Sequence, residues 1–316
     1  MFIKNILFNL IKYKLFIIIF LSLFILSFDF IILNNNSICL CTVGKRENLY
    51  IREFVEYYIK FGVDKIFLYD NNELNGEKFE DVIGDYINNK SVEIINYRGE
   101  RGNLIKIMDD CYQKNHNNYD WLIFYEIDEF LYLKNFNNIK YYLNQRKFNR
   151  CEAIQLNWVH RSDNNKIFYE NLPVQKRFTE RGKNVVKNKI NPLCFVKTII
   201  RGYLTNKKIT DNHYLTHNLK GCNGFGKKSK LFNIINKQPD YETYYINHYF
   251  SKSTEEFVNK INRGDILRGD NIKINNWQIK KYFIINKLTN EKLNYFDKHL
   301  GSKVNLSIYY EQLKKH

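Results

Sequence analysis

A nearly apolar run passes without a break into an acidic cluster at residues 121–133 (WLIFYEIDEFLYL). The first five residues are aromatic or branched, which is typical of a strand buried on both faces of a parallel sheet. The next four are Glu126-Ile127-Asp128-Glu129. Because carboxylates inside a sheet are costly unless they are paired or bind a metal, we expect this cluster at the carboxyl end of the strand. Ligands of open α/β sheets bind at that edge.

Glu126 and Asp128 are separated by one residue, so an extended backbone would direct both side chains the same way. Two carboxylates on one side, with positions left open for a phosphate, suit Mg²⁺ or Mn²⁺. A strand that ends in a solvated acidic turn would have the same short pattern. Both interpretations stay open from these residues alone.

Strand-like and helix-like segments alternate through the first half of the chain. Strand patterns occur at residues 37–43, 66–69, 92–97 and 121–125, and amphipathic helix patterns at 51–59 and 104–112. Short links between alternating segments predict the α/β class, with a Rossmann-like, mostly parallel sheet flanked by helices. Further strand patterns lie at 152–159, 194–200 and 244–249, a short helix pattern at 139–148, and a Gly/Lys-rich loop at 221–230. Ser253 and Glu256 have capping-box spacing, which predicts a helix that ends near Gly264.

An apolar segment near the N-terminus, residues 15–33, reaches the roughly 20 residues that a membrane-spanning helix needs. No small-residue cleavage site follows it, which argues against a removed signal peptide. Lysines precede the segment and few follow it, which predicts a single-pass type II anchor with a cytosolic N-terminus. In a eukaryotic host the rest of the chain would face the lumen of the endoplasmic reticulum or Golgi. An interfacial or partner-bound apolar helix is the alternative.

The formal net charge of +16 fits nucleic acid, an anionic membrane surface or a phosphorylated substrate. The Lys and Arg residues are spread along the chain, without a long basic block or a nucleic-acid module, so we expect no nucleic-acid partner. The six cysteines include no C-x-x-C pair, which makes zinc ribbons and thioredoxin-like chemistry improbable. Cys39, Cys111 and Cys194 lie in apolar surroundings and are predicted to be small core residues. Disulfides would fit a lumenal domain, but the sequence does not pair them.

Several motifs together resemble glycosyltransferase family 92 and its family-2-like bacterial relatives, which have the GT-A fold. They are Glu47 with Tyr50-Ile51-Arg52-Glu53-Phe54, Gly62-Val63 to Tyr69-Asp70-Asn71, residues 121–131, and His248-Tyr249 through Lys252-Ser253, Glu255-Glu256-Phe257, Lys260 and Arg263-Gly264. They cover most of residues 38–265. Two features depart from the family pattern: Glu126 stands where Asp is usual, and the segment after Trp158 lacks a glycine-containing turn.

The apolar segment and the resemblance together divide the chain into three predicted parts. Residues 1–36 are the cytosolic tail, signal-anchor helix and short linker, residues 37–265 the GT-A domain, and residues 266–316 a helical C-terminal extension. The resemblance also implies a metal-dependent, inverting transfer of a sugar from a nucleotide-diphosphate donor to a glycan hydroxyl.

The site residues follow from the same resemblance. Glu126 and Asp128 would bind Mn²⁺ or Mg²⁺, and His248 or His217 would complete the metal shell. The expected donor-binding residues are Glu47, Asp70, Asn71, Lys252, Lys260 and Arg263. A structural alternative accompanies each: a helix start for Glu47, a turn for Asp70 and Asn71, a solvated basic face for Lys260 and Arg263.

An inverting transfer needs a general base for the acceptor hydroxyl. Asp163, in a polar loop after a predicted strand, is one candidate, and Glu129 is the other, with support of the metal loop as its alternative role. Two other functions stay open. A catalytically inactive GT-A domain that binds glycans or acts as a scaffold would fit Glu126 in place of Asp, and a basic nucleic-acid-binding protein would fit the charge alone.

Overall fold

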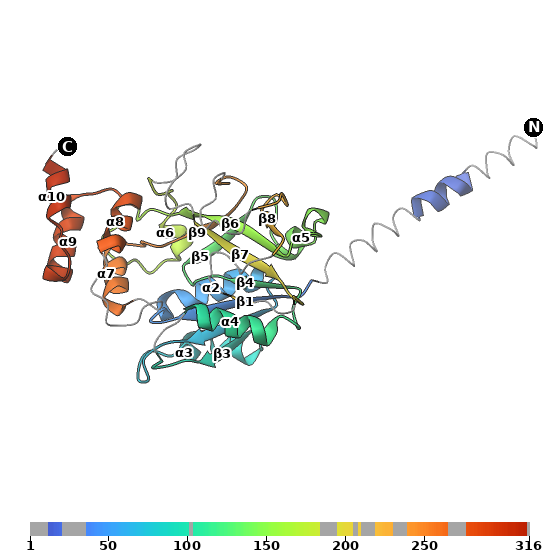
Figure 1. The fold of residues 1–316 in the computed structure, drawn as a ribbon, viewed down its shortest axis with the longest axis horizontal. Helices are drawn as coiled ribbons and strands as arrows, with labels where there is room; N and C mark the ends of the chain where they lie inside the picture. Colours follow the sequence, from blue (N-terminus) through green and yellow to red (C-terminus); the bar gives the residue numbers. More distant parts are fainter. Residues whose placement is uncertain are drawn as a thin grey trace, which may run out of the picture.

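The computed structural model describes residues 12–20, 36–100, 104–183, 195–204, 208–209, 219–229, 239–264 and 276–314. Within them nine strands form one sheet, in the order β3-β2-β1-β4-β7-β6-β9-β5, with β8 beside β6 (Figure 1). The strands are β1 (Ile38–Gly44), β2 (Lys65–Asp70), β3 (Val92–Asn96), β4 (Trp121–Phe124), β5 (Glu129–Leu133), β6 (Ala153–His160), β7 (Val196–Arg201), β8 (Gly221–Asn223) and β9 (Tyr244–His248).

Helices cover the sheet and extend from one end of it. The longer ones are α2 (Asn48–Lys60), α3 (Glu80–Asn88), α4 (Leu104–Asn115), α7 (Thr254–Arg263), α8 (Asn276–Ile285), α9 (Asn290–Leu300) and α10 (Ser307–Lys314). The short ones are α5 (Ile139–Leu143), η1 (Arg146–Phe148), α6 (Val174–Arg177) and η2 (Gly301–Lys303). Figure 1 shows α7 to α10 gathered at one end of the molecule, away from β3 and α3.

The sheet is mixed, with parallel pairings in both halves: β1–β2, β1–β4 and β2–β3 in the first, and β6–β8 and β6–β9 in the second. Parallel pairs therefore outnumber antiparallel pairs, but the second half of the sheet combines both kinds. Strands β3, β2, β1 and β4 are parallel to one another, as strand–helix–strand connections require. Beyond β4, the pairs β4–β7, β6–β7 and β5–β9 are antiparallel. After the acidic loop the chain enters β5, which pairs with β9 at the edge of the sheet.

The period-two pattern of β1 places its side chains in two separate cores. Ile38 and Leu40 pack with the apolar face of α2, whereas Cys39, Cys41 and Val43 pack with that of α4. The helices therefore cover opposite faces of the parallel strands, which explains the continuous apolar sequence of those strands. The carboxyl ends of β1 and β4 are left free between the two helix layers.

A third core joins the C-terminal helices to α7. Phe257 and Ile261 of α7 pack with Ile279 and Tyr282 of α8 and with Phe296 of α9. The described residues of the tail form α8, α9, η2 and α10, and buried side chains of α8 and α9 pack against α7. This packing places α8 beside the sheet edge that carries the acidic loop, because α8 and that loop line one cavity.

Some predictions concern residues outside the described ranges. Most of the predicted membrane anchor lies there, as do His217 and Cys194. Residues 12–20 are helical. In the described part of the chain, no helix is both long and apolar enough to cross a membrane.

Two disulfides join elements that are distant in sequence. Cys41 of β1 is bonded to Cys111 of α4, and Cys151 to Cys222 of β8. Cys111 is a buried core residue, as predicted. Its pairing with Cys41, which the sequence did not assign, arises because β1 and α4 pack face to face and bring the two thiols together. Cys39 is buried and free, as predicted.

Candidate functional site

The acidic loop is a tight turn, not an extension of β4. Residues 127–128 form the turn between β4 and β5. The Glu129 carboxylate accepts a hydrogen bond from the backbone N–H of Glu126 at 3.1 Å, and the Glu129 N–H donates to the Glu126 carbonyl at 2.9 Å. The extended geometry predicted for Glu126 and Asp128 is therefore wrong, because Glu129 closes the loop on itself. Both side chains nevertheless line one cavity.

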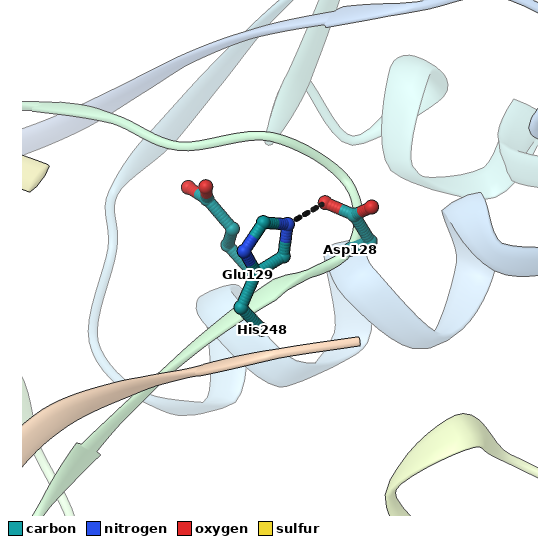
Figure 2. Close-up of side chains that lie close together, drawn as sticks. All are labelled: Asp128, Glu129 and His248. Carbon is teal, nitrogen blue, oxygen red and sulfur yellow. Dashed lines mark ion pairs between the residues drawn. The ribbon is translucent and has the colours of Figure 1, made fainter. Parts of the chain in front are cut away.

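Pairing between β5 and β9 brings a histidine to this loop. Glu129 lies opposite His248 in the antiparallel register. Asp128, Glu129 and His248 are buried, and their ligand atoms lie within 4.8 Å of one another (Figure 2). The Nε2 atom of His248 lies 3.5 Å from Oδ1 of Asp128. The imidazole lies between the two carboxylates in Figure 2, so a carboxylate and an imidazole nitrogen approach the same point.

The protonation states of this cluster suit cation binding. Burial lowers the pKa of His248 to about 4, so the imidazole is neutral at pH 7. Burial alone would raise the pKa of Asp128, but Lys260 and His248 hold it well below its usual range. A neutral imidazole beside an ionised carboxylate is the form in which these groups bind metals.

A buried lysine holds the other two carboxylates of the loop. Lys197 of β7 is fully buried, and its Nζ lies 2.7 Å from Oε1 of Glu126 and 3.2 Å from Oε1 of Glu129. Burial, together with the charges of Glu126 and Asp128, raises the pKa of Glu129 to about 8, although Lys197 acts in the opposite direction. Glu126 thus already has a cation, and the cluster of possible metal ligands contains Asp128 instead.

The loop opens onto a cavity of about 230 Å³. Its lining combines carboxylates, cations and aromatic rings: Val43, Glu47, Leu104, Glu126, Ile127, Asp128, Trp158, Phe195, His248, Phe250, Lys260, Arg263, Gly264, Trp277, Gln278 and Lys281. These residues come from the carboxyl ends of β1, β4 and β9, from α7, and from the C-terminal helix α8. Carboxylates, neutral imidazole and ammonium groups facing one space can hold a cation and an anion side by side.

Helix α7 directs two cations into this cavity. Lys260 Nζ lies 2.7 Å from Oδ2 of Asp128, and Arg263 Nη1 lies 2.5 Å from Oε1 of Glu47. Lys252 Nζ lies 3.7 Å from the same Glu47 carboxylate. Lys260 and Arg263 also line a second cavity of about 330 Å³, to which Lys252 contributes. The cations of α7 therefore face cavities rather than bulk solvent.

The position of α7 is fixed at its first turn. Ser253 caps the helix, and Glu256 completes the predicted capping box. The Glu256 carboxylate also accepts two hydrogen bonds from Arg177, at 2.7 and 2.9 Å, and one from the Tyr50 hydroxyl at 2.8 Å. Because Tyr50 belongs to α2, these bonds tie α7 to the helix that follows β1.

Comparison with known proteins identifies the family. No curated protein matches the chain. The sequence profile of Glycosyltransferase family 92 matches residues 35–303, which include every element named above except α10. The chain belongs to glycosyltransferase family 92. The resemblance inferred from the motifs is thereby confirmed, and with it membership of a family of transferases.

Similar solved structures include two glycosyltransferases. S. aureus TarS 1–349 in complex with UDP-GlcNAc is 11% identical, with a TM-score of 0.35, over 84% of this chain and 80% of that chain. The mannosyltransferase PcManGT from Pyrobaculum calidifontis in complex with GDP-Man and Mn²⁺ is 6% identical, with a TM-score of 0.30, over 38% of this chain and only 35% of that chain. Neither likeness supports a functional argument, so the proposals below build on family membership and on the site.

Two predicted donor-binding residues of this family 92 chain lie apart from the cavity. Asp70 is buried and pairs with Arg98 Nη1 at 2.5 Å. Arg98 also donates to the carbonyls of Glu73 and Gly76, and the Asn71 side chain donates to two further carbonyls. In the structure as described, Asp70 and Asn71 organise the loop after β2 and do not line the cavity.

The two candidate bases of the family 92 chain also lie outside the cavity lining. Glu129 points into the loop, where it meets Lys197. Asp163 is buried against the C-terminal helices, with the Tyr282 hydroxyl and Lys292 Nζ both 2.6 Å from Oδ2. Among the described residues, Glu126 and Asp128 are the acidic-loop carboxylates that reach the cavity.

Sequence reasoning missed three contributors to the site: Lys197, Trp277 and Lys281. Lys197 interrupts an apolar strand pattern, and a charge in such a position signals a buried partner. Lys281 lies among apolar residues in the sequence WQIKKYFII. The tail carries no recognisable motif, so its role becomes visible only when α8 is seen beside the cavity.

Proposed function

We propose that this chain is a metal-dependent glycosyltransferase that moves a sugar from a nucleoside-diphosphate donor to a glycan hydroxyl. The observation that carries the proposal is the Asp128–His248 pair, which faces a cavity shared with Lys260 and Arg263 at the carboxyl ends of β1 and β4. Ligands of open α/β sheets bind at this edge. Membership of family 92 supports the reaction class.

The residues present fit a divalent cation. Oδ1 of Asp128 is buried and accepts no hydrogen bond within the described part of the chain. An unsatisfied carboxylate oxygen beside a neutral imidazole is a donor set that suits Mn²⁺, and Mg²⁺ with additional water ligands. Asp128 and His248 would hold the ion, while Glu129 and Lys197 fix the loop that carries Asp128. A bound divalent ion would stabilise the negative charge that develops on the diphosphate leaving group.

The side chains of the chain supply the remaining electrostatics. Lys260 and Arg263 are placed to donate hydrogen bonds to diphosphate oxygens, where charge builds up as the sugar–phosphate bond breaks. Glu47, paired with Arg263 at 2.5 Å, fixes the direction of that guanidinium. Both cations are partly buried, with side chains 23% and 12% exposed, and reduced contact with water strengthens their interaction with an anion.

A panel of nucleotide sugars tests the proposal. Donor hydrolysis or transfer is measured with Mn²⁺, with Mg²⁺ and with a chelator, for the wild type and for Asp128→Asn. We expect one donor to be turned over only with a divalent ion, and only by the wild type. NMR of the product tests inversion, which the family resemblance implies. Binding of a nucleotide sugar without turnover would instead favour a catalytically inactive, glycan-binding domain.

We also propose a type II membrane orientation with the body of the chain in an oxidising lumen. The two disulfides support an oxidising compartment, since such bonds are rare in the cytosol. Asn305, in the sequon Asn305-Leu306-Ser307, is exposed and available for glycosylation. Expression with microsomes tests this orientation. A glycosidase-sensitive shift that disappears in Asn305→Gln is expected, whereas digestion of the body by external protease would contradict it.

A further inference from the structure

Lys281 is a buried lysine whose ammonium group lies in a nest of aromatic rings. Its Nζ is 4.0 Å from the ring centre of Phe250, 5.0 Å from Trp158 and 5.4 Å from Trp277. The residue is 4% exposed and lines the cavity that contains Asp128. Aromatic faces attract a cation but do not replace the hydrogen bonds that water gives it.

The other cations that line the cavity each form an ion pair with a carboxylate. Lys260 pairs with Asp128, and Arg263 with Glu47. Within the described residues, no carboxylate forms an ion pair with Lys281. Burial, with the charge of Lys260, lowers the pKa of Lys281 to about 7. An anion that entered the cavity would supply the missing partner.

The diphosphate of the donor is expected to bind at the acidic loop and not at Lys281. It would lie at Asp128, with the metal, Lys260 and Arg263, whereas Lys281 is held by rings from three different elements. Pockets lined by aromatic rings with one fixed polar group bind compact organic ligands in a defined orientation. An anionic group carried on a sugar ring satisfies both features, because the ring packs on the aromatic side chains and the anion meets Lys281. The basic net charge of +16 also draws anionic glycans to the protein.

Hydrogen bonds of the next residue in the helix, Tyr282, fix the position of Lys281. The Tyr282 hydroxyl lies 2.6 Å from Asp163 and 2.9 Å from the Thr254 hydroxyl. One turn later, the Asn286 side chain donates to Ser251 at 2.8 Å. Helix α8 is therefore bonded to both the β6 side and the α7 side of the domain. A preorganised helix can hold one ammonium group at a fixed point of the cavity.

We propose that Lys281, with the rings of Trp158, Phe250 and Trp277, forms a subsite that recognises an acidic sugar, one that carries a carboxylate, sulfate or phosphate ester. This subsite rests on the proposed glycosyltransferase function and specifies its substrate class. Helix α8 of the C-terminal extension thus selects the substrate, while the acidic loop performs the transfer. The acidic sugar is the acceptor or the transferred residue.

Ligand-observed NMR titration of the full chain at about pH 6, below the pKa of Lys281, tests the subsite. The probes are D-glucuronate and D-glucose 6-phosphate against neutral D-glucose, with diamagnetic Mg²⁺ and inorganic pyrophosphate present. We expect both acidic sugars to bind about tenfold or more tightly than glucose, since a charge-assisted hydrogen bond is gained. Lys281→Met should remove this preference, and Lys280→Met, at an exposed position on the same helix, should keep it.

Each outcome bears on the subsite. UDP-glucuronate against UDP-glucose repeats the comparison with the acid on the donor sugar, so a preference in this arm or in the free-sugar arm supports the subsite and identifies its source. No preference in either arm overturns it. A loss of pyrophosphate affinity in Lys281→Met as large as the loss for acidic sugars also overturns it, because Lys281 would then bind the leaving group.

Two measurements separate this inference from the proposed function. Melting temperatures of both methionine variants verify folding, which Lys281→Met should not impair, since methionine keeps the packing and removes a buried charge. If the wild type binds neither Mn²⁺ nor pyrophosphate, the proposed transfer reaction fails. The preference for acidic sugars over glucose is still measurable in that case, without metal.

Discussion

Two buried aspartates of this family 92 chain, Asp128 and Asp163, each pair with a lysine, but only Asp128 lines the cavity. Asp128 is 4% exposed and Asp163 1% exposed. Each has a lysine ammonium from a helix in the last quarter of the chain, Lys260 at 2.7 Å and Lys292 at 2.6 Å. Judged by burial and ion pairing alone, either could be the centre of a site.

The two aspartates differ in whether both of their carboxylate oxygens accept a hydrogen bond. Asp163 accepts from the Tyr282 hydroxyl, the Lys292 ammonium and the backbone N–H of Asn165, so both oxygens are occupied. Asp128 leaves Oδ1 without a hydrogen bond within the described residues, beside His248 and at a cavity wall. A saturated buried pair fixes the position of a helix, and an unsaturated one at a cavity can bind something. A buried carboxylate paired with a lysine is common to both regions and does not distinguish them.

The largest expected effect is the loss of transfer in Asp128→Asn. Removing the carboxylate should lower turnover by about a thousandfold or more, because metal stabilisation of the leaving group contributes several kcal/mol. Mn²⁺ affinity should fall in parallel. Lys260 loses its partner but reaches the cavity, so the melting temperature should change little. Turnover, Mn²⁺ titration and thermal melting of the same preparation provide the measurements, and full turnover would remove the basis of the metal assignment.

Asp163→Asn should have the opposite profile. Breaking a fully buried ion pair leaves Lys292 uncompensated, which typically costs 3–5 kcal/mol of folding free energy. Mn²⁺ affinity should stay within about threefold, because Asp163 does not line the cavity. Denaturant unfolding of Asp163→Asn, Lys292→Met and the double variant forms a cycle that isolates the pair. Loss of Mn²⁺ binding at unchanged stability would reverse the roles assigned to the two aspartates.

The sequence predicts the scaffold of the Asp128 region well. β1, β2, α2, α4 and β4 follow from apolar periodicity, because each pattern is read within a dozen residues. The acidic cluster and His248 were found because of their residue types and the family motifs. The turn at residues 127–128 was not foreseen, because the hydrogen bonds of Glu129 within the loop decide it, and not the alternation of residues.

Pairings over long sequence distances were not predictable. Lys197 lies 71 residues from Glu126, and Tyr282 lies 119 residues from Asp163. Nothing local in the tail shows that α8 packs beside the acidic loop. The family resemblance implies donor binding for Asp70, and its pairing with Arg98 at 2.5 Å was not foreseen. Carboxylates at strand ends can be located from the sequence. Whether each one already has an ion-pair partner depends on residues that are distant in sequence.

Lys281 gives a third, intermediate case: a buried charge that contacts aromatic rings and has no carboxylate in ion-pair distance among the described residues. Its pKa of about 7 lies below the ordinary value of 10.5, so the folded state releases the proton first. Below pH 7 both folded and unfolded chains carry the charge, and its burial destabilises the fold in full. Between pH 7 and 10.5 only the unfolded chain binds the proton, so stability rises with pH.

Lys281→Met should therefore be more stable than the wild type at about pH 6, by on the order of 2 kcal/mol, and the advantage should shrink toward pH 10. The full shift implies a larger figure, but relaxation of the folded protein around a buried charge reduces its cost. Paired denaturant melts of wild type, Lys281→Met and Lys280→Met at both pH values measure this. A pH-independent difference would mean that Lys281 keeps its charge through an unseen partner.

The smallest effect is expected at Glu126, the first carboxylate of the loop. Its partner Lys197 retains Glu129 at 3.2 Å when Glu126 is neutralised, and Glu126 is outside the Asp128–Glu129–His248 cluster. Glu126→Gln should reduce turnover by about tenfold at most, which is ~1.4 kcal/mol, and Glu126→Asp by less. Mn²⁺ affinity should stay within about threefold in both variants, measured beside Asp128→Asn in one titration series. If Glu126→Gln instead abolishes Mn²⁺ binding, both carboxylates act as ligands, and Lys197 must release Glu126 whenever the ion is bound.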